Sequence, residues 1–374
     1  MKSANPTLFT PLLGAFYFFY FALVGVYIIF MPKVLHDAGY SAAEVGTIYA
    51  AAPFMRFLLP FAFKYFLPLN ARTYQIALMC AVAATLLFFF TLQHFGIYFT
   101  VNLLFGASMG VTLPYVETIA LSKLDKTRYG KVRLWGSIGF MAVALWLGKV
   151  LESSTQALWY LFAATFFTMI FGLALLRFDH VPHESAAHAR DFSLRRYWAF
   201  WVSVFLMQVG FGGFYNFFTI YETSHGISLE VTGWMWSFGV ICEIAMLYFQ
   251  GPLLRRNLLR ILQAATLITA VRWLLLWYFA DSAAMTFISQ SLHAVSFALY
   301  HTAAISYVFS LYSQKRLAQQ FFLGIAFGLG GAVGALLAGK WYGENLFLYE
   351  AAVTFAAFTA MLWHEKRKKE KADV

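Results

Sequence analysis

Charged residues are scarce in this sequence. Asp, Glu, Lys and Arg together make up 12% of its 374 residues, while hydrophobic residues make up 61%. A soluble domain carries about a quarter charged residues. The shortage excludes an ordinary soluble domain and indicates a protein whose solvent is the lipid bilayer.

Cysteine is almost absent, and no enzyme motif is present. The two cysteines, Cys80 and Cys242, lie inside apolar runs and form no CxxC pair, so we interpret them as packing residues. The sequence contains no HExxH, nucleophile elbow, P-loop or Rossmann fingerprint. We therefore expect a protein that is not an enzyme, that has no metal or other cofactor, and that is not driven by ATP bound to this chain.

Long apolar runs dominate the sequence instead. Each is about 20 residues long and uniformly apolar, which favours helices over the alternating strands of a membrane barrel. We predict an all-α membrane protein with twelve transmembrane helices. The predicted spans are 7–31, 43–66, 73–93, 97–121, 133–151, 157–177, 197–222, 230–250, 259–279, 284–311, 319–341 and 347–363.

Lysine and arginine are distributed unevenly between the two sides that these spans create. One side carries the tail 365–374 and the basic segments after spans four, six and eight, whereas the other offers Lys33, Lys149 and Lys340. The positive-inside rule then places both termini in the cytoplasm. This bias accounts for the net charge of +10 without nucleic acid as a partner. We predict a monomeric, multi-pass protein of the cell inner (cytoplasmic) membrane.

The two halves of the sequence resemble each other at an offset of 187 residues. The matched pairs are Gly25 with Gly212, Gly39 with Gly226, Ser41 with Ser228, Gly46 with Gly233, and Arg56 with Glu243. This offset predicts two parallel six-helix repeats, with the substrate site between them near the middle of the membrane. The predicted parts are an N-terminal bundle 1–177, a cytoplasmic linker 178–196, a C-terminal bundle 197–364 and a basic cytoplasmic tail 365–374.

Ionisable residues inside three consecutive spans are the strongest functional signal. Glu243 lies near the middle of span eight, where a charge costs roughly 2.5–3.5 kcal/mol. Because desolvation favours a neutral carboxyl, Glu243 is a candidate proton carrier. Arg272, in the middle of span nine, stays charged and needs an anion, either Glu243 or a substrate carboxylate. A purely structural Glu243–Arg272 pair is the alternative.

Two histidines share span ten. His293 and His301 are eight residues apart, which on an α-helix places them on one broad face, about 12 Å apart along the axis. That distance is too long for a shared metal ion. We interpret both as candidates for proton coupling, with a helix–helix hydrogen bond as the simpler alternative.

The N-terminal half offers fewer ionisable candidates. Arg56 occupies the place that Glu243 has in the other repeat and is a second candidate for an anionic substrate group. Glu117, near the cytoplasmic end of span four, is a gating candidate that pairs with Arg133 or Arg56, or it forms a structural ion pair. The weaker substrate-binding candidates are Tyr20, Tyr27, Gln208, Tyr215 and Asn216.

Several segments resemble the phenylpropionic acid permease branch of the major facilitator superfamily. They are RYGKVRLWGSIGF at 128–140, EIAML around Glu243, VRW at 271–273 and LHAVSFALYH at 292–301. The wider relatives include the lactose permease and nucleoside–proton symporters. The resemblance implies proton coupling by a glutamate on span eight, an arginine on span nine and a histidine on span ten. Glu243, Arg272, His293 and His301 lie on those spans.

The sequence departs from the superfamily in the loop between spans two and three. That loop usually carries a glycine–aspartate–basic signature, whereas FKYFLPLNAR keeps Lys64 and Arg72 without the aspartate or glycine. Span ten also has no acidic residue beside its histidines, so Glu243 is the expected proton site.

These observations predict a secondary active transporter. Its expected activity is proton-coupled import of a small organic solute, an aromatic or other monocarboxylate, by alternating access, with protons, the solute and the bilayer as partners. The alternatives are a proton symporter of a neutral sugar or nucleoside, an efflux protein for amphipathic compounds, and a membrane protein that transports nothing.

Overall fold

The structure is a computed structural model that describes residues 8–65, 69–124, 126–179 and 193–370. These residues form helices and turns, and no strand occurs among them, which confirms the predicted all-α class. The helices before residue 180 are α1 (Phe9–Gly25), η2 (Val26–Phe30), α2 (Met31–Asp37), α3 (Ala42–Tyr65), α4 (Ala71–Thr91), α5 (Phe95–Lys123), α6 (Lys126–Val150), η3 (Ser154–Gln156), α7 (Ala157–Leu175) and η4 (Leu176–Phe178).

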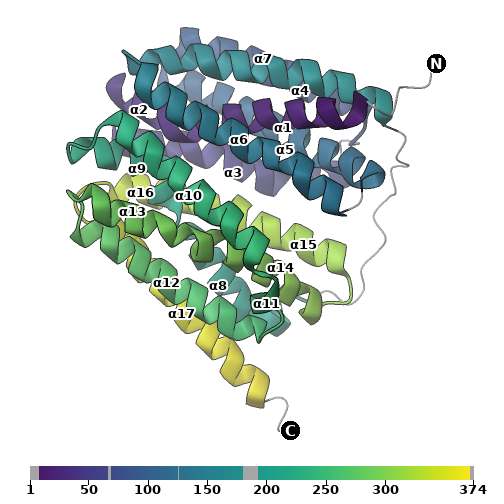
Figure 1. Cartoon of the computed structure of the whole chain (residues 1–374), viewed down its shortest axis with the longest axis vertical. Coiled ribbons are helices and arrows are strands. Elements are labelled where there is room, and N and C mark those ends of the chain that lie inside the picture. Colours follow the sequence, from purple (N-terminus) through teal and green to yellow (C-terminus); the bar gives the residue numbers. More distant parts are fainter. Residues whose placement is uncertain (1–7, 66–68, 125, 180–192, 371–374) are drawn as a thin grey trace. The chain divides into compact units, whose positions relative to one another are not determined.

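The second half of the chain continues the same pattern (Figure 1). Its helices are η5 (Arg195–Tyr197), α8 (Trp198–Val209), α9 (Gly212–Ser224), α10 (Leu229–Phe249), α11 (Gly251–Leu254), α12 (Leu258–Tyr278), α13 (Ala283–Ser291), η6 (Ala294–Leu299), α14 (Tyr300–Leu311), α15 (Lys315–Leu323), η7 (Gly324–Gly330), α16 (Gly331–Trp341) and α17 (Leu346–Glu370).

The chain divides into two compact units, Met1–Ala186 and Ala187–Val374. In the first, α1 packs against α6 and α7, and α5 packs against α3 and α4; in the second, α17 packs against α8 and α12, and α10 packs against η6 and α13. Most of the predicted linker 178–196, with His180, His183 and His188, lies outside the described residues, as do the last residues of the predicted tail.

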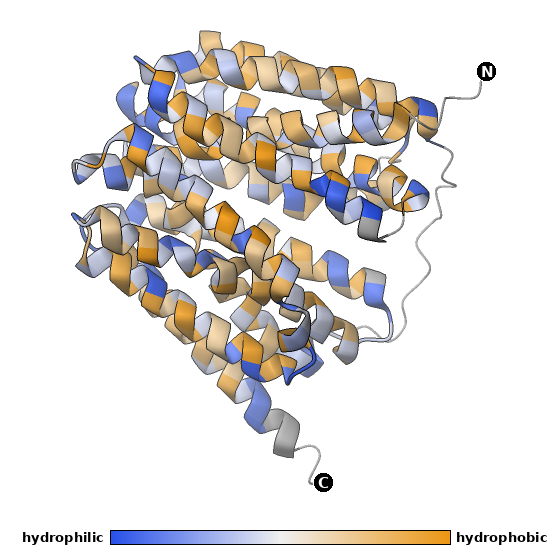
Figure 2. Cartoon of the chain, in the orientation of Figure 1, coloured by the Kyte–Doolittle hydropathy of each residue, from blue (hydrophilic) through white to orange (hydrophobic). Residues whose placement is uncertain are grey.

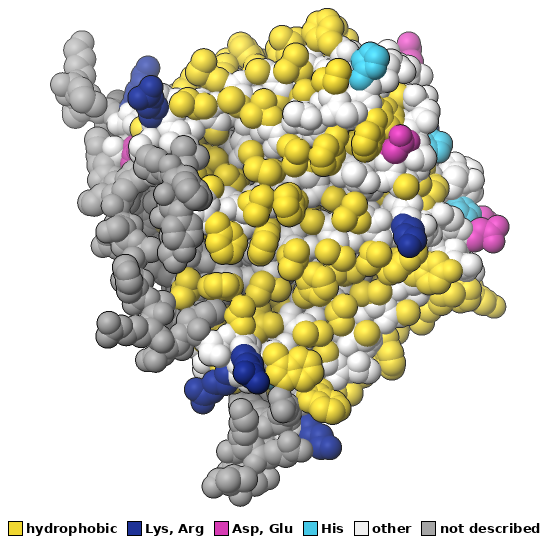
Figure 3. Space-filling view, turned by 180° about the vertical axis from the view of Figure 1, so that it is seen from behind, with side chains coloured by type: hydrophobic (Ala, Val, Ile, Leu, Met, Phe, Trp, Pro, Cys, Tyr) yellow, Lys and Arg dark blue, Asp and Glu magenta, His cyan; other side chains and the backbone are white. Residues whose placement is uncertain are grey.

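Eleven helical segments of the described residues are long and apolar enough to cross a membrane. They coincide with the predicted spans except the fifth, where α6 carries Lys126, Arg128, Lys131 and Arg133 in its first turns. Large hydrophobic side chains also face outward, such as Phe90, which is 74% exposed. Hydrophobic residues line the helices (Figure 2) and cover much of the face in Figure 3, as contact with lipid requires.

Several of the membrane helices are interrupted. Wider π-helical turns occur at η2, η6 and η7, and the helix predicted at 197–222 breaks at Gly210 and Phe211 into α8 and α9. Such π segments are frequent at functional sites, since they change which side chains share a face. The interruptions at η6 and at the α8–α9 break both lie beside the polar residues described below.

The turns between the first two helices of each half are built alike. Gly39 and Gly226 have positive φ angles of 95° and 80°, which favour glycine. The hydroxyl of Ser41 then accepts a hydrogen bond from the N–H of Glu44, and that of Ser228 accepts one from the N–H of Val231, so each serine caps the following helix. The local geometry thus repeats at the offset seen in the sequence.

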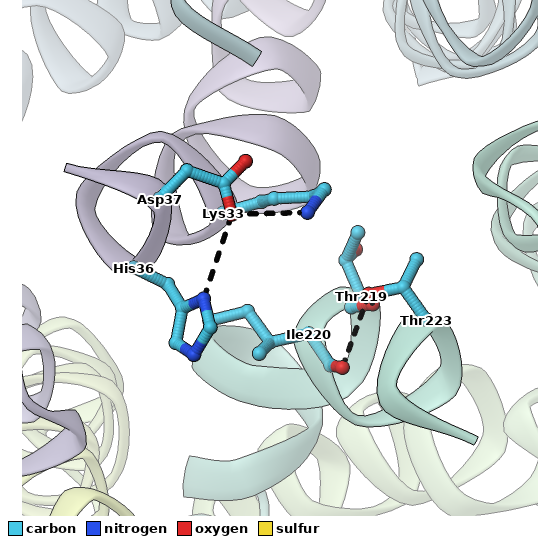
Figure 4. A network of polar contacts seen from close by, with 6 residues as sticks. All are labelled: Lys33, His36, Asp37, Thr219, Ile220 and Thr223. Carbon is cyan, nitrogen blue, oxygen red and sulfur yellow. Dashed lines mark hydrogen bonds and ion pairs between the residues drawn. The ribbon is translucent and has the colours of Figure 1, made fainter. Parts of the chain in front are cut away.

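Short polar contacts also lie at the ends of the helices that precede these turns, as Figure 4 shows. In the first unit, the ammonium of Lys33 lies 3.1 Å from Asp37 Oδ1. In the second unit, the hydroxyl of Thr223 donates to the backbone carbonyls of Thr219 and Ile220. Asp37 thereby offsets the charge of Lys33. Lys33 is one of the few basic residues predicted on the side of the membrane opposite the two termini.

Close packing of α1 on α6 depends on Gly139. A Cβ atom at this position would overlap the backbone of Phe18, whereas a Cβ at Gly130 on the same helix meets nothing within 4 Å. We expect Gly139→Ala to lower the free energy of unfolding by about 1–3 kcal/mol, because overpacking forces the two helices apart. Thermal unfolding of purified protein measures this. Gly130→Ala is the control, and equal midpoints for the two variants would contradict the packing.

Candidate functional site

Arg272 is the centre of a buried polar network in the second unit. Its side chain on α12 is fully buried. Nη1 donates to His293 Nδ1 and to the hydroxyl of Ser296, both at 3.0 Å, and Nη2 donates to Gln290 Oε1 at 3.0 Å. These bonds satisfy most of the guanidinium donors, which a charge buried in an apolar unit requires.

Aromatic rings complete the enclosure of the guanidinium. The Cζ atom of Arg272 lies 4.3 Å from the ring centroid of Phe214, 4.5 Å from that of Trp273 and 5.8 Å from that of Phe211. The ring faces attract the cation, and they do so more strongly away from water. Arg272 is therefore held by polar groups of the segment 290–296 and by rings from α9, α12 and the break before α9.

The hydrogen bond from Arg272 fixes the tautomer of His293. A guanidinium has donors only, so Nδ1 of His293 must accept, and a neutral imidazole then carries its proton on Nε2. Nε2 lies 3.6 Å from Oε2 of Glu243, slightly beyond hydrogen-bond length. The side chain of Glu243 is 22% exposed. Glu243 is therefore the member of the network that is accessible from outside the protein.

The structure alters the expected pairing of Glu243. No ion pair joins Glu243 and Arg272 among the described residues, because His293 lies between them. The direct Glu243–Arg272 pair, which was one of the alternatives for Arg272, is thus not formed in this structure. An acidic residue does stand beside a span-ten histidine, but it comes from α10 and not from the histidine's own helix.

The geometry between the two histidines also differs from the prediction. The π-helical segment η6 lies between them, so the regular α-helix assumed for that stretch was wrong. Phe297 nevertheless stacks with both rings, with centroids 5.1 Å from His293 and 6.1 Å from His301. His301 therefore faces the same side, although its Nδ1 has no hydrogen-bond partner among the described residues.

Three polar residues of the network were not among the sequence candidates. Gln290 and Ser296 bind the guanidinium, and the hydroxyl of Ser289 donates to the backbone carbonyl of Arg272. The signal was present in SQSLHAVS at 289–296, where Gln290, His293 and Ser296 recur every third residue in an otherwise apolar run. Polar residues at that spacing share one face of a helix.

Buried acids form a second group that the sequence reasoning missed. Glu350 on α17 and Glu222 on α9 are 1% and 0% exposed. Glu350 accepts a hydrogen bond from the backbone N–H of Gly213, and Glu222 Oε2 accepts one of 3.4 Å from Thr286. Both lie inside predicted spans, so their presence in apolar runs was the available signal.

The expected ion pair between Glu117 and Arg133 is present in the first unit. Nε of Arg133 lies 3.8 Å from Oε1 of Glu117, and the hydroxyl of Tyr129 donates to the same oxygen at 3.2 Å. The guanidinium also lies over the ring of Phe21, 3.9 Å from its centroid. Arg56, in the same unit, is exposed and has no hydrogen bond or ion pair among the described residues.

The uncharged candidates divide into two groups. Tyr20 and Tyr27 are engaged within the first unit, since the Tyr20 hydroxyl contacts the carbonyl of Met109 and that of Tyr27 donates to Asn102. In the second unit the ring of Tyr215 stacks on Phe211, 5.5 Å between centroids. Asn216 donates to the carbonyl of Gly212, and Gln208 is half-buried at the α8–α9 break.

Among the described residues, membrane-length apolar helices enclose a buried charge network, as in a multi-pass membrane protein. The chain belongs to the MFS_1 like family, whose sequence model matches residues 12–355. The fold agrees, since the nucleoside transporter NupG superposes with a TM-score of 0.79 over 96% of this chain and 99% of that one, at 18% identity. A POT family peptide transporter superposes with a TM-score of 0.74, covering 96% of each chain at 13% identity.

Relatives are also found by sequence. The chain is 26% identical over 359 residues to the "Probable 3-phenylpropionic acid transporter" of Escherichia coli (strain K12), covering 91% of this chain and 94% of that protein. It is 24% identical over 317 residues to the "Uncharacterized transporter YwbF" of Bacillus subtilis (strain 168), covering 79% and 77%. The resemblance to the phenylpropionic acid permease branch is thereby confirmed.

We expect Arg272→Lys to destabilise the second unit although it conserves the charge. A lysine ammonium cannot reproduce the planar fork that reaches His293, Ser296 and Gln290 together. The expected loss in the free energy of unfolding is about 3 kcal/mol, the scale for breaking a buried ionic network. Thermal unfolding in detergent measures it, with Arg260→Lys on the exposed end of α12 as the control. A midpoint equal to that of the control would contradict the network's role.

Proposed function

We propose that this protein imports a small aromatic monocarboxylate together with a proton, by alternating access. Glu243 and His293 carry the proton step, with His301 as an accessory group. Membership of the transporter family supports the general activity. The bacterial relatives support a location in the inner membrane. The basic segments and tail support an orientation with both termini in the cytoplasm.

The observation that carries the proposal is the line Glu243–His293–Arg272. Its members run from a partly exposed carboxylate, through a histidine of fixed tautomer, to a fully buried cation. When a proton neutralises Glu243, the carboxylate facing His293 Nε2 disappears and the net charge of the network rises by one. A substrate anion restores the balance. Proton and carboxylate therefore favour each other's binding, which is a coupling free energy between two sites.

The relative with a named substrate supports an aromatic acid. The Escherichia coli protein is named "Probable 3-phenylpropionic acid transporter" and aligns with 91% of this chain. Aromatic residues make up 20% of this sequence, and several surround Arg272 in the second unit. A flat ring and one carboxylate match that combination.

The two candidate arginines have different environments. Arg272 is enclosed by protein groups, so a substrate carboxylate reaches it only after a rearrangement. Arg56 is exposed and unpaired among the described residues. We assign Arg56 the first contact with the substrate carboxylate, and Arg272 the response to the charge on Glu243. The Glu117–Arg133 pair is the proposed gate.

Replacing Glu243 separates proton coupling from substrate passage. In reconstituted vesicles, Glu243→Gln should abolish uphill uptake of labelled 3-phenylpropionate driven by a pH gradient, because the glutamine side chain cannot bind and release a proton. Exchange of internal for external substrate should persist within about threefold, since the isosteric amide preserves packing.

The control is Glu230→Gln, an exposed residue at the start of the same helix α10. It should retain both uphill uptake and exchange. Uphill uptake by Glu243→Gln at the unmodified rate would refute the assigned proton site, and absence of proton-driven uptake by the unmodified protein would refute the proposed coupling.

A neutral solute is the second candidate, favoured by the complete enclosure of Arg272 by protein groups. Arg56→Gln decides between the two. For a carboxylate we expect its KM to rise about tenfold or more, the loss of at least 1.4 kcal/mol of binding, with the maximal rate kept. Arg72→Gln, an exposed arginine on α4, is the control. Uptake of an uncharged sugar or nucleoside that survives Arg56→Gln would establish the neutral-solute function instead.

A further inference from the structure

An apolar groove with a volume of about 460 Å³ lies between α8 and η7 in the second unit. Hydrophobic side chains from both helices line it, among them Trp198, Val202, Phe205, Ile325 and Leu329. Trp198 is 42% exposed and Val202 is 38% exposed. The groove is therefore open on one side to the surroundings of the protein, which for a membrane helix are lipid.

The groove ends where the two helices touch each other. A Cβ atom at Gly330 would lie 2.9 Å from the backbone oxygen of Phe205, and one at Gly334 on α16 would lie 2.8 Å from that of Val209. Small residues allow membrane helices to approach this closely. Toward the start of α8 the groove takes the place of this close contact, so its walls are fixed by the packing at the glycines.

The groove reaches from the membrane boundary into the apolar core. Its walls belong to the membrane-length segments Arg195–Ser224 and Leu317–Trp341, which are spans seven and eleven and start from the same side of the membrane. Arg195 is the first residue of its segment, and Phe205 follows ten residues later, about 15 Å along a helix. That length covers the headgroup region and the outer part of the hydrocarbon.

Arg195 places a positive charge at the open end of the groove. It lines the groove and is exposed, and it has no hydrogen bond or ion pair among the described residues. No acidic residue is among those that line the groove. Trp198 follows at the depth where tryptophan is enriched in membrane proteins. A guanidinium above an apolar groove matches a phosphate that is joined to a hydrocarbon chain.

We propose that this groove binds an anionic phospholipid. One acyl chain lies between α8 and η7, and the phosphate lies on Arg195. An anionic headgroup is preferred to a zwitterionic one, because the amine of a zwitterionic lipid finds no acidic partner in the groove and repels Arg195. The site is independent of the transport activity proposed above, since none of its residues belongs to the Arg272 network.

Arg196 provides a matched control for Arg195. It is the next residue and is also exposed, but its guanidinium lies over the ring of Tyr197, 5.4 Å from the centroid. It lines a separate polar pocket with Tyr312 and Gln314. Arg196→Gln therefore removes the same charge from the same segment without removing a group that lines the groove.

Binding of lipids to the purified full-length protein tests the headgroup contact. Native mass spectrometry compares phosphatidylglycerol with phosphatidylcholine of the same acyl chains. We expect the unmodified protein to bind phosphatidylglycerol about fivefold more tightly, the effect of one arginine on an anionic headgroup. Arg195→Gln should abolish this preference, and Arg196→Gln should keep it.

Two results of this measurement would overturn the proposal. One is an equal preference in the unmodified protein and in Arg195→Gln. The other is displacement of phosphatidylglycerol by inorganic phosphate, which would reveal a site for a soluble anion instead of a lipid.

A phosphatidylglycerol with a photoreactive group on its acyl chain locates the chain. In vesicles of phosphatidylcholine that contain a small share of this probe, crosslinks should concentrate in residues 194–205 and 325–329. Val202→Trp places an indole in the groove and should reduce these crosslinks about threefold. The control Ile241→Trp, at a position on α10 that is 52% exposed, should leave them unchanged.

The crosslinks of the unmodified protein decide the site even if Val202→Trp does not fold. Crosslinks spread evenly over exposed hydrophobic residues such as Phe90 and Tyr248, which are 74% and 82% exposed, would overturn it. That pattern is the one expected from general contact with the bilayer.

Discussion

A permanently charged guanidinium inside an apolar unit constrains everything around it. Arg272 cannot become neutral as a carboxyl can, so the fold must supply acceptors, rings and counter-charge at one point. The acceptors come from the segment 290–296, the rings come from α9, α12 and the break before α9, and the Glu243 carboxylate on α10 faces His293. Two interruptions of the second unit, η6 and the break between α8 and α9, contribute groups that contact this residue.

The fold was predictable because the bilayer imposes its own pattern. Apolar runs of membrane length can only be helices, so the predicted spans coincide with the observed segments even where α6 is too charged to qualify by composition. The turns at Gly39–Ser41 and Gly226–Ser228 have the same glycine and serine at an offset of 187 residues. Both glycines have a positive φ angle, and both serines cap the following helix. The division into bundles around residues 178–196 stays a prediction.

The contacts within the site were not predictable from the sequence. Spans could be assigned to Glu243, Arg272 and His293, but which of them touch depends on how helices rotate against one another. The π-helical turn of η6 alters the register of span ten after His293. Helix propensities of the residues do not predict this turn. Glu350 was missed because its role depends on a helix break 137 residues away in sequence, although an acid in an apolar run deserved notice.

The central claim is that a proton crosses with an aromatic carboxylate. The most direct measurement follows lumen pH in vesicles containing the protein, after 3-phenylpropionate is added outside without an imposed gradient. Protein-free vesicles account for passive entry of the acid. The account predicts faster acidification of the lumen with the protein than without it, in proportion to substrate taken up. Substrate entry through the protein with no accompanying change in lumen pH would contradict it.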